Sequence, residues 1–140
     1  YDPVHDEMYL ASHDTPATRN GKRIHVTDID EIDLATVAIG LKPSKGKSEG
    51  LAMLTPMVEA GTRLYRNSSG ALSLAYVADG RLDAYVETHM HSWDFMAGAL
   101  IVRQAGGVLR DFDVTAALTE GAPVIASNGR LDLMLPPAYS

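Results

Sequence analysis

The chain has 140 residues, of which 46% are apolar and 21% charged, a length and composition typical of one compact globular domain. A formal net charge of −6 without any basic run argues against nucleic acid as the main partner. The absence of cysteine excludes disulfides and thiolate metal sites, and no apolar stretch approaches the roughly 20 residues needed to cross a bilayer, so we expect a cytoplasmic protein without a membrane partner.

The first 33 residues are predicted to form hairpins and a connector. Residues 1–11 are expected to hold two short strands around a turn near His5 and Asp6. Asn20 and Gly21 tolerate positive φ and indicate a two-residue hairpin turn, which places the next strand at residues 22–26. Residues 27–33 form an acidic connector whose carboxylate spacing does not match a calcium-binding loop. We therefore treat residues 1–33 as the end of an N-terminal sheet region.

From residue 34 onward, strand-like and helix-like segments alternate. Strands are expected at 34–41, 62–66, 81–87, 108–112 and 123–126, and helices at 49–60, 69–78, 94–105 and from Asn128 to Pro137. Residues 42–48 are expected to form a surface loop, and Pro56 to break the first helix or to open a second short one. This alternation predicts a C-terminal layered α/β domain over residues 34–140.

Trp93 and Asp94 mark the junction between the strand at 81–87 and the helix at 94–105. Asp94 is therefore expected at a helix N-terminus beside the carboxyl end of a strand, where open α/β sheets place ligands. Its carboxylate could cap the helix, hold a metal ion, or do both. Glu87 closes the preceding strand. It is either a solvated strand end or a second carboxylate in the same crevice, able to accept hydrogen bonds from a hydroxyl-rich substrate.

Residues 66–71 join a strand to a helix through small and hydroxylated side chains. Ser68 or Ser69 could cap the helix, and the exposed backbone N–H groups could face an anion. The loop lacks the glycine spacing of a phosphate-binding P-loop, so a simple cap and a binding loop are equally consistent with it.

His89 and His91 would point the same way in an extended segment. A zinc site is conceivable, but no third ligand follows at a familiar spacing. A structural role, or a place at the edge of a substrate site, is favoured.

A resemblance to a known family rests on several spaced features. Residues 69–87, followed by Ser92, Trp93 and Asp94 and by a segment that closes with Gly106 and Gly107, resemble the C-terminal signature of the inositol monophosphatase family. Residues 1–11 and 20–22 are similar to the segment that follows the main metal motif of that family. The resemblance covers nearly all of the chain.

The resemblance implies a layered αβαβα sandwich of the sugar-phosphatase type, of which this chain would form the C-terminal part. It implies a Mg²⁺-dependent phosphatase that acts on a small-molecule phosphate ester through a metal-activated water, and a homodimer. Asp94 would be the catalytic metal ligand that also meets the substrate, Glu87 would contact substrate hydroxyls, and Ser68, Ser69 and Gly70 would line the substrate pocket. Inositol monophosphate is the first choice of substrate, with histidinol phosphate, fructose bisphosphate and nucleotide 3′-phosphates open.

The sequence also departs from the family pattern. The Asp-Pro-Ile-Asp-Gly-Thr motif and the upstream Glu that shares its metals are not among these residues and would lie before Tyr1. Because Asp94 alone cannot complete the octahedral shells of magnesium ions, we expect the chain alone to be inactive. Ser68 stands where many relatives have Gly, and Pro16 falls in the segment before Asn20 where the family has a Gly-x-Gly-Ala pattern. A non-catalytic interaction or regulatory module with the same fold is the alternative.

Overall fold

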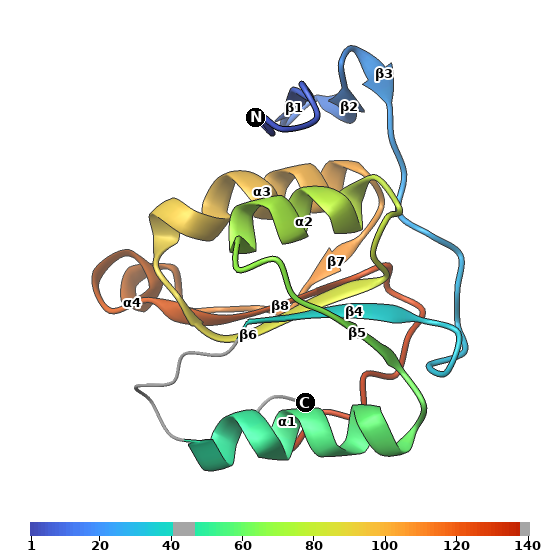
Figure 1. Ribbon diagram of the computed structural model, residues 1–140. Coiled ribbons are helices and arrows are strands. Elements are labelled where there is room, and N and C mark those ends of the chain that lie inside the picture. The colour runs from blue at the N-terminus through green and yellow to red at the C-terminus, as the bar shows by residue number, and fades with distance from the viewer. Residues whose placement is uncertain (41–46, 138–140) are drawn as a thin grey trace.

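Layers of sheet and helix follow one another in the computed structural model, which describes residues 1–40 and 47–137 (Figure 1). A three-stranded antiparallel sheet comes first, formed by β1 (Tyr9–Ser12), β2 (Thr15–Arg19) and β3 (Lys22–Arg23). Helices α2 (Gly70–Ala78) and α3 (Ser92–Gln104) lie between it and a five-stranded sheet, and α1 (Lys47–Glu59) covers the far face of that sheet. This order is that of consecutive layers in the expected αβαβα arrangement.

The five-stranded sheet has the order β5-β4-β6-β8-β7. Its strands are β4 (Thr36–Gly40), β5 (Arg63–Tyr65), β6 (Ala84–Met90), β7 (Val108–Leu109) and β8 (Ala122–Ser127). Strand β4 pairs in parallel with both β5 and β6, whereas β8 runs antiparallel to its neighbours β6 and β7. The three parallel strands therefore end at one edge of the sheet, where Gly40 pairs with Glu87. Ligand sites in α/β sheets form at such an edge.

Two apolar cores lie on the two faces of this sheet. Tyr85 belongs to the core under α2 and α3, whereas its neighbours Ala84 and Val86 belong to the core under α1, because successive strand residues point to opposite faces. Burial on both faces explains why central strands such as β4 are apolar almost throughout. Glu87, two residues after Tyr85, is thereby directed to the face that carries α2 and α3.

Helices α2 and α3 pack closely because α3 carries a glycine at the contact. A Cβ at Gly98 would lie 2.7 Å from Cβ of Leu74, a distance that side-chain atoms do not tolerate. Leu74 and Phe95 are both fully buried in this core. The close packing holds the beginnings of α2 and α3 at the same edge of the sheet.

Charged groups dock the three-stranded sheet onto the end of α2. Nη1 of Arg19 lies 2.7 Å from Oδ2 of Asp79, which also accepts a hydrogen bond of 2.8 Å from the Tyr9 hydroxyl. Asp79 is the C-cap of α2, and its side chain is fully buried. Ion pairs of Arg81 with Glu7 and Asp79 extend this network. Buried carboxylates are tolerated here because each is paired.

Asp2 is a second buried carboxylate at the same junction, only 1% exposed. It accepts hydrogen bonds from the Tyr76 hydroxyl at 2.6 Å, from Nδ1 of His5 at 2.7 Å and from the backbone N–H of Val4 at 3.0 Å. These bonds, that from Tyr76 foremost, hold the pKa of Asp2 well below its ordinary value. The N-terminal turn is thereby joined to the last turn of α2.

Several element predictions are confirmed. Asn20 and Gly21 have φ of 49° and 75°, as the predicted hairpin turn requires, although β3 ends at Arg23. Residues 27–33 form no regular element. The strand expected at 81–87 begins at Ala84 and extends to Met90. The division of the chain at residue 34 stays a prediction.

Other element predictions are wrong. Helix α1 continues through Pro56, because Met53 and Met57 on either side of it are buried in the core and packing outweighs the lost hydrogen bond. Residues 128–137 contain no helix; the Asn128 amide instead donates to the carbonyl of Ile29 at 2.7 Å. Helix α4 (Val114–Thr119) was not predicted. Most of the predicted loop at 42–48 lies outside the described residues, and its last two residues begin α1.

Candidate active site

A pocket of about 420 Å³ opens at the carboxyl edge of the parallel strands. It is lined by Ser68, Ser69, Gly70, Ala71, Tyr85, Glu87, His89, Met90, His91 and Asp94. A smaller hollow of about 140 Å³ adjoins it, shares the Ser68–Gly70 loop, Tyr85 and Glu87, and extends to Gly40 and Asn67. All five residues that the sequence nominated as site residues therefore line one pocket, although they come from three different elements.

The loop before α2 is held in one conformation by its own side chains. Oδ1 of Asn67 accepts hydrogen bonds from the Ser69 N–H and the Ser73 hydroxyl, each at 3.0 Å. The Ser69 hydroxyl accepts from the N–H of Leu72 at 3.3 Å, so Ser69, not Ser68, is the N-cap of α2. The first turn of α2 thus presents its positive end to the pocket.

Ser68 has a φ of 61°, in the left-handed region. This conformation costs little for glycine and more for a residue with a Cβ. This explains why a glycine would suit the position. Ser68 adopts the left-handed conformation at the cost of local strain.

Asp94 lies in the first turn of α3 but does not cap the helix. The N-cap is His91, which makes no side-chain capping bond, and the backbone N–H of Asp94 donates to the carbonyl of His91 at 2.9 Å. Of the roles that the sequence left open for Asp94, capping of α3 is therefore excluded. Its side chain is exposed, and no partner in the described part of the chain forms a hydrogen bond or ion pair with its carboxylate. The N-terminus of α3 favours a carboxylate at this place.

Glu87 lies at the shared wall of the two hollows, where two glycines make room. A Cβ at Gly40 would lie 1.5 Å from Oε2 of Glu87, and one at Gly70 would lie 2.8 Å from the Tyr85 hydroxyl. Oε2 of Glu87 accepts a hydrogen bond from that hydroxyl at 3.1 Å. Sequence reasoning missed Gly40 and Tyr85. The signal for Tyr85 was its place two residues before Glu87 on the same face of a strand.

Two imidazoles line the opposite part of the pocket. The rings of His89 and His91 meet edge to face at 5.2 Å, and His91 stacks on Trp93 at 4.4 Å with 13° between the planes. Trp93 itself is 74% exposed. Both histidines line the pocket, and the prediction of a structural role or a place at the edge of a substrate site stays a prediction.

A zinc site at these histidines finds no support in the structure. Within residues 1–40 and 47–137, the one group of three side chains close enough to share a metal ion is Asp2, His5 and Glu7. That group already binds the Tyr76 hydroxyl and Arg81, and it serves to dock the N-terminal sheet.

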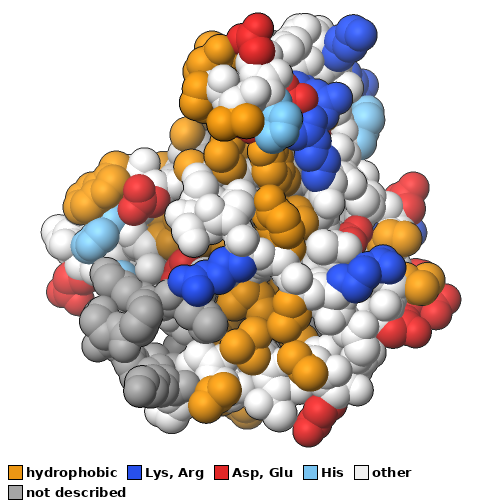
Figure 2. Space-filling model, viewed as in Figure 1, with side chains coloured by type: hydrophobic (Ala, Val, Ile, Leu, Met, Phe, Trp, Pro, Cys, Tyr) orange, Lys and Arg blue, Asp and Glu red, His pale blue; other side chains and the backbone are white. Residues whose placement is uncertain are grey.

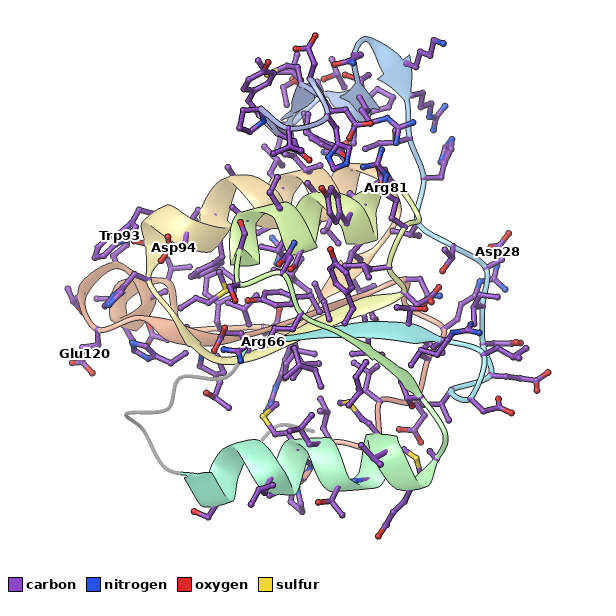
Figure 3. All side chains as sticks on the ribbon, viewed as in Figure 1. Asp28, Arg66, Arg81, Trp93, Asp94 and Glu120 are labelled. Carbon is purple, nitrogen blue, oxygen red and sulfur yellow. The ribbon has the colours of Figure 1, made fainter. Side chains whose placement is uncertain are left out.

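The acidic connector takes no part in the pocket. Figure 3 shows Asp28 at the far end of the sheet from Asp94, while Arg66 lies near the pocket edge where β5 ends. Asp28 forms an ion pair with Arg130 at 3.1 Å, in keeping with its prediction as a solvated connector residue.

The oxygen donors of the pocket suit Mg²⁺. Asp94 and Glu87 supply carboxylates and the Ser68–Gly70 loop supplies hydroxyls, which hard cations prefer, whereas the imidazoles of His89 and His91, which line the same pocket, are ligands that softer metals prefer. An octahedral ion needs about six oxygens, and the single unengaged carboxylate of Asp94 provides only part of that set. These residues fit one side of a magnesium site.

The fold and the pocket define a layered α/β protein with a pocket at the carboxyl edge of its parallel strands, the place where such folds form ligand sites. Comparison with known proteins identifies the family. The model of the inositol monophosphatase family matches residues 1–137, and the chain belongs to this family.

Individual relatives agree. The chain is 35% identical over 133 residues to the protein named Nus factor SuhB of Haemophilus influenzae and 34% identical over 132 residues to inositol-1-monophosphatase of Mesorhizobium japonicum. These alignments cover 94% and 91% of the chain but only 50% and 49% of the two relatives. The chain therefore spans about half the length of the curated relatives that it matches.

Solved structures give the same result. Inositol monophosphatase from Anabaena superimposes with a TM-score of 0.82 at 28% identity, covering 93% of this chain and 52% of that one. The suhB protein of Bartonella henselae superimposes with a TM-score of 0.84 at 30% identity, covering 93% and 50%. The resemblance seen in the sequence is confirmed, as is the fold class of a C-terminal portion. No helix in the described residues is both long and apolar enough to traverse a bilayer.

Proposed function

We propose that the chain supplies the C-terminal half of the active site of a Mg²⁺-dependent phosphomonoesterase acting on inositol monophosphate or a related sugar phosphate. The observation that carries the proposal is that Asp94, Glu87 and the Ser68–Gly70 loop converge on one pocket in a member of this family. Separately, each of these residues has an ordinary structural explanation. Together they form a concave site with two acidic groups at a helix-rich edge of the sheet.

Each residue of the pocket has a role that follows from its chemistry. The exposed Asp94 carboxylate would hold the metal ion from one side and contact the substrate. When bound, magnesium supplies positive charge that acidifies a water molecule and neutralises the phosphate. Backbone N–H groups at the start of α2 would orient the ester, and Glu87 would accept hydrogen bonds from its hydroxyls.

The pocket favours a hydroxylated ester. Glu87 and Asp94 are acceptors when ionised, so a substrate group facing them must donate a hydrogen bond, which ring hydroxyls do and a second phosphate does not. Inositol monophosphate therefore stands ahead of fructose bisphosphate, whereas histidinol phosphate and nucleotide 3′-phosphates, which also carry donors, remain open.

The test is phosphate release by the full-length protein from these four esters, with magnesium and after its removal by a chelator. We expect release to require magnesium, to return when the metal is restored, and to be fastest with inositol monophosphate. A protein that is folded by circular dichroism and releases no phosphate from any of the esters would contradict the proposal.

The second candidate is an interaction or regulatory module without catalysis. It is favoured by the name Nus factor given to several relatives that match most of this chain. The two candidates differ in their dependence on Asp94. Replacement of the gene by an Asp94→Asn variant would preserve the cellular role of an interaction module and abolish that of a phosphatase.

The remaining proposals follow the family resemblance. We propose a homodimer in the cytoplasm, with a small-molecule phosphate ester as partner and neither nucleic acid nor membrane as the main one. Sedimentation of the full-length protein tests the oligomeric state.

A further inference from the structure

Tyr85 links the interior of the protein to the wall of the pocket. Its side chain is part of the core between the two sheets, and the residue is only 3% exposed. Its hydroxyl nevertheless reaches the pocket lining, where it borders both hollows. A buried phenol needs a hydrogen-bond partner, and here the partner is the carboxylate of Glu87.

The Tyr85–Glu87 pair is enclosed on two sides by glycines that leave no space for a side chain. Gly40 ends β4 and abuts Oε2 of Glu87, the same oxygen that accepts the Tyr85 bond. Gly70 begins α2 and abuts the Tyr85 hydroxyl. The pair therefore sits in a close-fitting site built from three elements, which restricts the rotation of the Glu87 carboxylate.

The hydroxyl is suited to act as the donor in this pair. Burial, and then the charge and hydrogen bond of Glu87, raise the pKa of Tyr85 above its ordinary value. The phenol therefore stays protonated at neutral pH, and its proton points to the carboxylate. The Tyr85 hydroxyl thereby holds Oε2 of Glu87 in place before any substrate binds.

We infer that Tyr85 is a positioning residue that orients the Glu87 carboxylate and so sets the preference for hydroxylated phosphate esters. The inference rests on the proposed function, because it assigns a selectivity to the same pocket. A carboxylate held in one orientation accepts a substrate hydroxyl without first losing rotational freedom. Esters without hydroxyls gain nothing from this orientation.

The first variant is Tyr85→Phe in the full-length protein, which removes one oxygen and keeps the ring in the core. KM for inositol monophosphate should rise about tenfold, the loss typical of a hydrogen bond to a charged group, with a much smaller change in kcat. The kcat/KM for p-nitrophenyl phosphate, which has no hydroxyls, should fall much less, so that the preference between the two esters shrinks. Tyr65→Phe is the matched control, because Tyr65 is 39% exposed on β5 and borders neither hollow.

A second variant disturbs the Tyr85–Glu87 pair through Gly40, without removing the Tyr85 hydroxyl. Gly40→Ala keeps the tyrosine side chain, but its Cβ would lie 1.5 Å from Oε2 of Glu87 and 2.9 Å from the Tyr85 hydroxyl, so the pair must move. It should raise KM for inositol monophosphate in the same way. Should Tyr85→Phe fold poorly by circular dichroism, Gly40→Ala carries the kinetic test.

A double-mutant cycle shows whether Tyr85 acts through Glu87. In a Glu87→Ala background, Tyr85→Phe should leave KM unchanged, because the group that Tyr85 orients is no longer there. The same four proteins unfolded in urea should show a non-additive effect on stability, which reports the bond without any catalysis.

The outcomes separate the two proposals. A wild-type protein that releases no phosphate from any ester overturns the phosphatase proposal and this inference with it, even where the urea cycle is non-additive. An active wild type whose Tyr85→Phe variant keeps the same preference for inositol monophosphate over p-nitrophenyl phosphate overturns the inference alone. Additive stabilities in the urea cycle also overturn it.

Discussion

Asp94 and Ser68 both line the pocket, but their backbone conformations differ. Asp94 occupies a regular helical turn with its carboxylate unengaged among the described residues, so its side chain is available to a ligand. Ser68 lies in the left-handed region at φ 61°, and this backbone conformation shapes the loop before α2. Strained residues of this type gather at binding sites because surrounding bonds hold them in place, as Asn67 does here.

Substitution of Asp94 separates function from folding. Asp94→Asn in the full-length protein should lower magnesium-dependent phosphate release by at least about 100-fold, because an amide is a poor ligand for a hard cation. Stability should fall by no more than about 1 kcal/mol, since only the interaction with the helix dipole is lost and the side chain caps nothing. Phosphate release and urea unfolding measure the two effects.

The matched control for that substitution is Asp30→Asn in the exposed connector, which should leave both quantities unchanged. Near-normal turnover by Asp94→Asn would count against a metal-binding role for this carboxylate.

At the scale of elements, the N-terminal sheet is joined to α2 by buried charged groups as well as by the apolar core that Tyr9 and Ala17 share with α2. The Asp2 carboxylate is buried in this junction, and its depressed pKa makes the docking sensitive to acid. A carboxylate with a pKa below its unfolded value stabilises the fold above that unfolded value, near 4, and loses this contribution as the pH falls toward the folded value.

The pH dependence can be measured with Tyr76→Phe, which removes the strongest cause of the shift at Asp2. Wild type should be more stable than the variant at pH 7, and the difference should shrink as the pH falls below about 4 and Asp2 becomes protonated in both proteins. Urea unfolding at several pH values provides the measurement. Tyr65→Phe should show a difference that does not change with pH; a constant difference for Tyr76→Phe would argue against the role of Asp2.

At the scale of the whole molecule, the described surface carries apolar side chains beyond the pocket. Figure 2 shows them over the N-terminal turn and again across the middle of the face in view. Tyr1, Val4 and Leu10 are 63%, 85% and 66% exposed. The exposed apolar surface and the partial metal shell of the pocket both agree with the finding that the chain spans about half the length of its relatives.

The incomplete metal shell leads to a prediction for the 140-residue chain alone. It should fold, with the mixed α/β circular dichroism expected from its layers, but should release phosphate at least about 100-fold more slowly than the full-length protein, since Asp94 cannot by itself coordinate magnesium octahedrally. Phosphate release by both proteins under saturating magnesium is the measurement. Comparable rates for the two would mean that the described pocket is sufficient.

The sequence allowed accurate prediction wherever a local rule governs the structure. The turn at Asn20 and Gly21 requires positive φ, a serine cap before an apolar helix was expected at Ser68 or Ser69 and lies at Ser69, and the strand–helix junction before Asp94 follows from a change of periodicity. Prediction failed where distant packing decides. Pro56 remains helical because the residues beside it are buried in the core. The described segment after Asn128 forms no helix, and the Asn128 side chain instead bonds to the connector.

The sequence by itself determined the family signature, the layered α/β class and the residues nominated for the site, because these depend on side-chain chemistry and on spacing along the chain. Only the tertiary structure decided that Glu87 shares a close-fitting site with Tyr85, Gly40 and Gly70, and that Asp94 faces the pocket instead of capping its helix. The physical reason is that strand pairing and helix packing bring together atoms far apart in sequence. A one-dimensional pattern specifies which groups are available, and the packing of β4, β6, α2 and α3 specifies which of them meet.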